Sequence, residues 1–88
     1  MRVAFRDSFA KDLRSVKEKG LLKRVKEIVE AVEKADLLEE TPNLKRLKGG
    51  RGYFRLRVGD YRIGLALEND TVVLVRFLHR KDIYKYFP

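Results

Sequence analysis

Two short segments of the chain combine arginines with aromatic residues, as contact with a polyanion requires. Residues 53–62 alternate arginines with apolar side chains, and residues 79–84 place basic and aromatic groups near the C-terminus. Arginine suits phosphate because its planar guanidinium donates two parallel hydrogen bonds, and aromatic rings stack on bases. These segments predict a cationic, aromatic-lined surface and suggest nuclease chemistry.

Cleaving RNA without a metal needs a base for the 2′-hydroxyl, an acid for the leaving 5′-oxygen, cations for the developing charge, and in-line positioning. The candidate cations are Arg55, Arg57, Arg62 and Arg80. Tyr84 can stack on a base or orient the 2′-hydroxyl. His79 is the one side chain that titrates near neutral pH unaided. In the simpler alternative, His79 is an ordinary residue at a strand end and Tyr84 pins the C-terminus to a sheet.

Positive charge is concentrated in the middle and at the end of the chain. The net charge is +8, and residues 43–62 hold seven basic groups and one acidic group. Such segregation fits nucleic acid, and it fits an acidic protein partner equally well. The remaining basic candidates for RNA binding, expected to act by electrostatic attraction, are Lys45, Arg46, Lys48, Arg51, Lys81 and Lys85.

Several classes of protein are excluded by composition. The chain has no cysteine and one histidine, so neither a disulfide nor a conventional zinc site is expected, and we expect no metal and no cofactor. No segment approaches the ~18 apolar residues of a membrane span, and the N-terminus lacks the apolar run of a signal peptide. We expect a cytoplasmic protein without a membrane partner, with residues 1–88 forming one domain.

The N-terminal half predicts a strand followed by two helices. Residues 2–5 form a short strand, and Asp7 or Ser8 caps a helix that Gly20 breaks. Apolar residues at helical spacing predict a second helix from Leu21 or Leu22 to residue 36 or 37. Two helices joined this closely should form an antiparallel pair.

The C-terminal half predicts three antiparallel strands. Residues 53–58 alternate with period two, and the turn Gly59-Asp60 places Arg57 directly across from Arg62. Like charges in register destabilise a sheet, so an anionic ligand is the reason to expect this pairing. A last strand covers residues 71–78. A two-residue turn before it puts Val73, Val75, Phe77 and His79 on the arginine face. A three-residue turn puts Arg76 there instead, and we favour this register because it buries fewer charges.

Residues 80–87 should form a helical turn. The predicted fold class is therefore α+β, in the order β-α-α-β-β-β(-α), with a small, mainly antiparallel sheet packed on two N-terminal helices. The segment from Lys48 to Gly52 is predicted to be a plain connector into a strand.

The chain resembles the RelE/ParE superfamily of toxins from type II toxin–antitoxin pairs, and the RelE branch in particular. The resemblance covers nearly the whole length. It rests on Leu47-Lys48-Gly49 followed by residues 53–64, and on residues 78–84, in this order and spacing.

The resemblance implies an mRNA interferase, an endoribonuclease that cleaves mRNA in the ribosomal A site by 2′-hydroxyl attack. It implies that Arg62 stabilises the phosphorane, that Arg80 contacts the scissile phosphate and is placed to assist the leaving group, and that Tyr84 stacks on or orients the nucleotide. Arg55 and Arg57 match lysine positions of the best-known member, where one lysine is proposed as the general base. Arginine is a poor base because its pKa exceeds ~12. Either His79 takes this role, or catalysis is largely electrostatic and slow.

The resemblance also implies partners: the ribosome, mRNA, and an acidic RelB-like antitoxin that covers the basic face. Two alternatives use the same fold. One is a ParE-like inhibitor of DNA gyrase, and the other is a catalytically inactive module that binds RNA or the ribosome. The set Arg62, Arg80 and Tyr84 argues against the gyrase inhibitor, because that branch usually lacks it.

Overall fold

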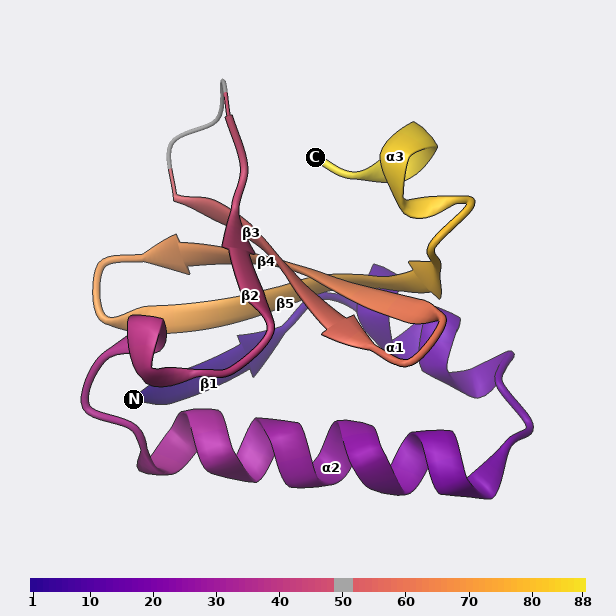
Figure 1. Ribbon diagram of the computed structural model, residues 1–88, viewed down its shortest axis with the longest axis horizontal. Helices are drawn as coiled ribbons and strands as arrows, with labels where there is room; N and C mark the ends of the chain where they lie inside the picture. The colour runs from indigo at the N-terminus through magenta and orange to yellow at the C-terminus, as the bar shows by residue number, and fades with distance from the viewer. Residues whose placement is uncertain (49–51) are drawn as a thin grey trace.

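The computed structural model describes residues 1–48 and 52–88, which form a sheet with helices on one face and the C-terminal segment on the other (Figure 1). The elements are β1 (Arg2–Phe5), α1 (Asp7–Arg14), α2 (Lys19–Lys34), the 3-10 helix η1 (Leu38–Glu40), β2 (Leu44–Arg46), β3 (Tyr53–Val58), β4 (Tyr61–Glu68), β5 (Thr71–His79) and α3 (Ile83–Tyr86). The predicted α+β fold class is confirmed.

The sheet has the strand order β1-β5-β4-β3-β2. Strand β1 pairs with β5 in parallel, and the other neighbours are antiparallel. The edge strand β2 was not predicted, because three residues are too few for a period of two to be recognised in the sequence. The hairpin register of β3 and β4 is confirmed, with Arg57 opposite Arg62 and Val58 opposite Tyr61.

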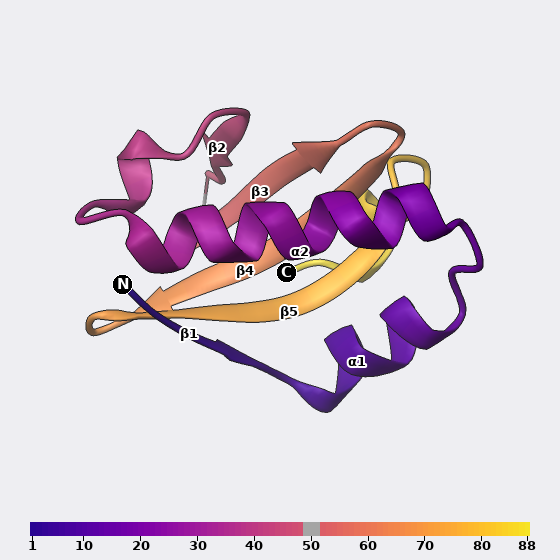
Figure 2. The same ribbon diagram turned by 90° about the horizontal axis from the view of Figure 1, so that it is seen from below.

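Helices α1 and α2 cover one face of the sheet, and Figure 2 shows α2 crossing it while α1 lies beside the end of β5. The prediction that Gly20 breaks the helices is wrong, because α2 begins at Lys19 and includes it. The break lies at Ser15, whose hydroxyl donates to the carbonyl oxygen of Asp12 at 2.7 Å. This bond occupies a carbonyl that the next helical turn would need.

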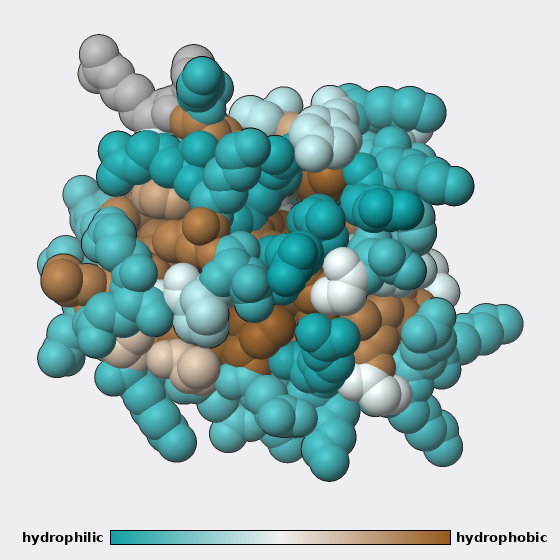
Figure 3. Space-filling view, viewed as in Figure 1, coloured by the Kyte–Doolittle hydropathy of each residue, from teal (hydrophilic) through white to brown (hydrophobic). Residues whose placement is uncertain are grey.

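The core lies between the helices and the sheet. Val58, Ile63 and Val72 are fully buried, and the ring of Phe9 in α1 packs edge-on against Phe77 in β5. Each side chain of this kind stabilises the fold by roughly 1.5–3 kcal/mol on burial. Hydrophilic residues cover most of the outer surface in the view of Figure 3. Within the described residues, no helix is long and apolar enough to cross a membrane.

The register of β5 differs from both predicted alternatives. Asn69 and Asp70 form a two-residue turn, since Glu68 pairs with Thr71. A bulge then shifts the register, because Leu74 pairs with Leu65 while Arg76 pairs with Gly64. Val75 is the extra residue. The preferred outcome, Arg76 on the arginine face, is therefore reached through a bulge and not through a longer turn.

The C-terminal segment packs on the face of the sheet opposite to α1 and α2. Ile83 and Phe87 are buried, and the ring of Phe87 lies edge-on to Tyr53. Gly64 in β4 allows this contact, because a Cβ there would come within 2.5 to 2.8 Å of three Phe87 ring carbons. The predicted helical turn at the C-terminus is confirmed as α3.

Replacing Gly64 with alanine should displace Phe87 and the segment that carries α3. We expect Gly64→Ala to lower the free energy of unfolding by about 1–3 kcal/mol, as overpacking does in a closely packed site. Urea unfolding measures this change. Gly20→Ala is the matched control, because nothing lies within 4 Å of a Cβ at that position, and it should raise stability by about 0.4–1 kcal/mol. Equal stability of Gly64→Ala and the parent chain would contradict the packing described.

Candidate functional site

A small cleft opens on the sheet face that carries the arginines, beside α3. Its volume is about 280 Å³. We call it the cationic cleft, and its lining residues are Asn43, Lys45, Arg55, Arg57, Arg62 and Tyr84. Four of these six residues carry a positive charge.

Strand pairing brings the four charges together. Alternation along β3 puts Arg55 and Arg57 on one face, and the β3–β4 hairpin sets Arg62 opposite Arg57. On the other side of β3, β2 sets Lys45 opposite Arg55. Like charges opposite one another destabilise a sheet by a few tenths of a kcal/mol or more. The arrangement therefore costs stability, which an anionic ligand would restore.

The cations of the cleft are not neutralised by carboxylates in the described part of the chain. The ion pairs there join Arg6 to Glu68 and Arg76 to Asp12, and neither includes a residue of the cleft. A multiply charged anion could therefore take the place that a carboxylate occupies in an ordinary surface pair.

Arg62 is held by its own turn. Its Nη1 donates to the carbonyl oxygens of Gly59 at 2.9 Å and Tyr61 at 2.8 Å. Gly59 has a φ of 58°, a conformation that glycine adopts without strain. Within residues 1–48 and 52–88, Nε and Nη2 of Arg62 make no hydrogen bond, so these N–H groups of a cleft-lining residue are available to a phosphate.

Tyr84 contributes the aromatic wall. The guanidinium carbon of Arg55 lies 4.3 Å from the centre of the Tyr84 ring, a cation–π contact that is worth roughly 0.5–1 kcal/mol at an exposed site. Tyr84 is 70% exposed. Its ring therefore has a fixed orientation and free surface on which a nucleobase could stack.

A chain of contacts from α1 supports α3, the helix that carries Tyr84. The guanidinium carbon of Arg76 lies 5.6 Å from the centre of the Tyr86 ring, and Nε of Arg76 donates to Asp12 at 2.8 Å. The hydrogen bond that Arg76 donates to the Asp12 carboxylate raises the pKa of the Arg76 guanidinium. Asp12 also accepts the backbone N–H of Phe77 at 2.9 Å, beyond the end of β1. The bulge thus presents Arg76 to α1 and α3 together.

His79 lies apart from the cationic cleft. It follows Phe77 on the face that packs against the helices, where its ring meets Tyr61 edge-on at 5.5 Å. Its Nδ1 accepts the backbone N–H of Lys81 at 3.2 Å. A separate pocket that includes Arg24 and Glu18 of the α2 region adjoins it. The structure therefore does not bring His79 together with Arg55, Arg57 and Arg62.

Arg80 is exposed and does not line the cleft. Its backbone N–H donates to the carbonyl oxygen of Asp60 at 2.7 Å, so its main chain lies against the turn that holds Arg62. Among the six residues predicted for RNA binding, Lys45 alone of those described lines the cleft. Arg46 points to the opposite face, where its guanidinium carbon lies 5.2 Å from the centre of the Phe54 ring.

The other described residues predicted for RNA binding are not part of the lining of the cleft. Lys48, Lys81 and Lys85 are exposed and outside its lining. Arg51 lies outside the described residues. Asn43, which the sequence analysis missed, lines the cleft and has a φ of 65°. Its carbonyl oxygen accepts the N–H of Arg57 at 3.1 Å. An asparagine directly after Pro42 is a recognisable turn signal, and this signal could have indicated Asn43 from the sequence.

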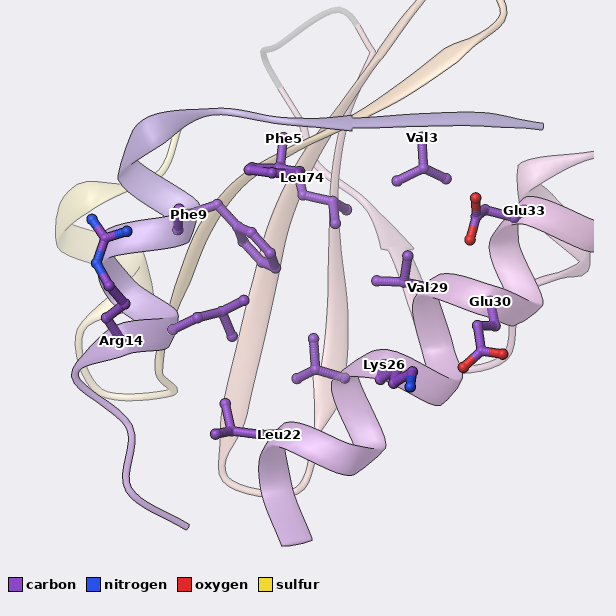
Figure 4. A pocket seen from close by; sticks show the side chains of 13 residues that line it. Val3, Phe5, Phe9, Arg14, Leu22, Lys26, Val29, Glu30, Glu33 and Leu74 are labelled. Carbon is purple, nitrogen blue, oxygen red and sulfur yellow. The ribbon is translucent and has the colours of Figure 1, made fainter. Parts of the chain in front are cut away.

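A second concavity lies on the helix side of the sheet. An apolar groove of about 680 Å³ runs between α1 and α2 over β1 and β5 (Figure 4). We call it the apolar groove. Its wall includes Phe9, Val29 and Leu74, with Phe5 at its edge. Phe5 is 66% exposed and extends the apolar surface of the groove, and contiguous apolar surface of this kind marks interaction sites. The predicted helix pair is thus antiparallel in direction (Figure 2) but separated by this groove.

This sheet, with two helices on one face, has the fold of the small RelE-like toxins. The family model described as "ParE toxin of type II toxin-antitoxin system, parDE" matches residues 3–84. The chain therefore belongs to this family of type II toxin–antitoxin toxins, within the RelE-like superfamily, and the resemblance read from its motifs is confirmed.

Individual relatives agree with this assignment. The chain is 43% identical to Toxin RelE3 of Methanocaldococcus jannaschii, with all of both chains covered. A crystal structure of a RelB-RelE antitoxin-toxin complex from Methanococcus jannaschii matches with a TM-score of 0.83 at 41% identity, covering 97% of this chain and 99% of the other. The archaeal RelE-RelB complex from Pyrococcus horikoshii OT3 shares the fold, with a TM-score of 0.71 at 23% identity, covering 90% and 93%.

Removing the Asp12 carboxylate should loosen α1 and α3 together. Asp12→Asn weakens a largely shielded contact to Arg76 and to the Phe77 N–H, so we expect a loss of about 1–3 kcal/mol in the free energy of unfolding. Glu68→Gln is the control, because the Arg6–Glu68 pair is about half exposed at both ends, and it should cost about 0–1 kcal/mol. Thermal or urea unfolding compares the two. If Asp12→Asn and Glu68→Gln lower the free energy of unfolding by the same small amount, the proposed support of α1 and α3 by Asp12 is wrong.

Proposed function

We propose that this chain inhibits translation by cleaving mRNA in the ribosomal A site, as an endoribonuclease that needs no metal. One observation carries the proposal. The cationic cleft gathers Arg55, Arg57 and Arg62 beside an exposed aromatic ring, without carboxylate partners among the described residues. A site with three guanidinium groups and a stacking surface is suited to a nucleotide with its flanking phosphates.

The reaction proposed is an internal phosphoryl transfer. The 2′-oxygen forms a bond to phosphorus, the bond from phosphorus to the 5′-oxygen breaks, and the products are a 2′,3′-cyclic phosphate and a 5′-hydroxyl end. Arg62, fixed by Gly59 and Tyr61, stabilises the charge that develops on the phosphorane. Arg55 and Arg57 hold the flanking phosphates. Tyr84 stacks on the nucleotide and keeps the 2′-oxygen in line.

Arg80 is assigned a supporting phosphate contact. Its main chain is bonded to Asp60 in the turn that holds Arg62, and its side chain is exposed. The remaining exposed cations, Lys48, Lys81 and Lys85, attract the ribosome-bound RNA through the net positive field of the protein.

Replacing Arg62 should abolish cleavage while leaving the fold intact. Arg62→Ala removes the most firmly oriented cation of the cleft, and we expect the cleavage rate to fall about 100-fold or more, as for other losses of oriented charge stabilisation. Primer extension on mRNA from translating ribosomes measures the new 5′ ends. Arg2→Ala, an exposed arginine on the far edge strand β1, is the control and should cleave normally.

The gyrase-inhibitor alternative is kept because the matching family model describes a ParE toxin. The two functions separate in one comparison. If the protein arrests growth, yields no new 5′ ends with ribosomes and blocks supercoiling by DNA gyrase, then the nuclease proposal is wrong. If it arrests growth and neither cleaves nor blocks supercoiling, the inactive RNA- or ribosome-binding module is favoured.

For neutralisation we propose an acidic, RelB-like antitoxin, as in the RelB-RelE complexes of the similar solved structures. The apolar groove is the proposed seat of an apolar segment of that partner. Covering the exposed Phe5 and the groove beside it would stabilise the complex, because buried apolar area contributes roughly 25 cal/mol per Å² to the free energy of association. The acidic part of the partner would meet the cationic face.

The two exposed apolar residues Phe5 and Leu37 provide a matched test. Phe5→Ser removes an apolar contact at the groove, so the dissociation constant for the cognate antitoxin should rise at least about tenfold. Leu37→Ser alters a residue that is 60% exposed and lies outside the groove lining, and it should bind normally. Calorimetric titration measures both. Normal binding by Phe5→Ser would remove the groove from the interface.

A further inference from the structure

The cationic cleft places a lysine where the reaction lacks a base. We propose that Lys45 of β2 is the general base that removes the proton from the 2′-hydroxyl. This inference rests on the proposed nuclease function. It addresses the gap left by Arg55 and Arg57, which occupy β3 and carry guanidinium groups, which are poor general bases.

Strand pairing fixes the position of Lys45. It stands directly opposite Arg55 on the neighbouring strand, on the same face as Arg57 and Arg62. It lines the cleft together with Tyr84. Lys45 therefore borders the same small cleft as the guanidinium groups that would hold the phosphate, and this places it next to a 2′-hydroxyl bound beside that phosphate.

The chemistry of the lining selects Lys45 by elimination. An asparagine amide and three guanidinium groups do not exchange protons usefully, which leaves Lys45 and Tyr84. One face of the Tyr84 ring lies against Arg55, whose guanidinium carbon is 4.3 Å from the ring centre, and the exposed remainder is assigned to stacking on the base in the proposed mechanism. A lysine can act as a general base in an enzyme site.

Other basic residues and His79 do not share this position. Arg46, the next residue along β2, faces the opposite side of the sheet and packs on Phe54. His79 lies on the helix side with Tyr61. Among the lysines of residues 1–48 and 52–88, Lys45 is the one in the lining of the cleft.

The proposed step balances in protons and bonds. The neutral amine of Lys45 takes the proton of the 2′-hydroxyl as the 2′-oxygen attacks phosphorus. The bond to the 5′-oxygen breaks, and water supplies the proton for that oxygen. The Lys45 ammonium then returns its proton to solvent. Arg62 stabilises the phosphorane throughout, without gaining or losing a proton.

The test separates charge from proton transfer. Lys45→Arg keeps the positive charge and removes the base, so we expect single-turnover cleavage of ribosome-bound mRNA to fall about 100-fold while ribosome binding is retained. Lys11→Arg, on the exposed side of α1, is the matched control and should keep both the cleavage rate and ribosome binding.

Chemical rescue gives a second readout. The chain contains no cysteine, so Lys45→Cys provides a single thiol that bromoethylamine converts to an aminoethyl side chain close in length to lysine. Cleavage should be lost in Lys45→Cys and return after this modification. If the modified protein binds ribosomes and stays inactive, the assignment of the amine is wrong.

The outcomes distinguish this inference from the proposed function. Normal cleavage by Lys45→Arg, with Arg62→Ala inactive, would overturn the Lys45 assignment and leave the nuclease proposal standing. A parallel loss of ribosome binding and cleavage in Lys45→Arg would make Lys45 a binding residue and also overturn the assignment. If the parent protein fails to cleave at all, the proposed function falls, and the Lys45 assignment falls with it.

Discussion

The register of the β3–β4 hairpin governs both faces of this protein. Arg57 and Arg62 face each other on one side, while the neighbouring residues Val58 and Ile63 are fully buried on the other. A slip of one residue would exchange the two sets and place guanidinium groups in the core, which the desolvation of a charge forbids. The burial of apolar side chains under the helices therefore holds the arginines together against their repulsion. The arginines meet in the cleft because the opposite face of the same strands is buried in the core.

The bulge in β5 connects the two layers. Without it, Arg76 would face the helices, because side chains alternate strictly along a regular strand. With it, Arg76 reaches Asp12 of α1 and Tyr86 of α3, while Phe77 returns to the core. Gly64, opposite Arg76, leaves room for the ring of Phe87. Bulges often re-aim side chains beside functional sites. Here the effect is to fix the short helix that presents Tyr84.

The cationic cleft and the apolar groove have separate proposed roles. The cationic cleft lies on the arginine face and suits an RNA phosphate chain, whereas the apolar groove lies between α1 and α2 and suits an apolar segment of a protein. In the proposed arrangement, an antitoxin segment in the groove would bind the face opposite to the cationic cleft. Fold alone does not separate nuclease from gyrase inhibitor. The proposal of nuclease function therefore rests on the residues of the cleft.

The sequence by itself determined the fold class, the β3–β4 register and the family, because alternation, the Gly59-Asp60 turn and two motifs are local signals. It also indicated one candidate group of Arg55, Arg57, Arg62, Arg80, Tyr84 and His79, of which the structure brings Arg55, Arg57, Arg62 and Tyr84 to the cleft. Tertiary structure alone decided that His79 faces the helices, that Arg46 turns away, and that Lys45 enters the cleft. These outcomes depend on the three-residue strand β2 and on the bulge at Val75. The short strand and the bulge both depend on pairing with other strands, and such pairing produces no periodic pattern in the sequence.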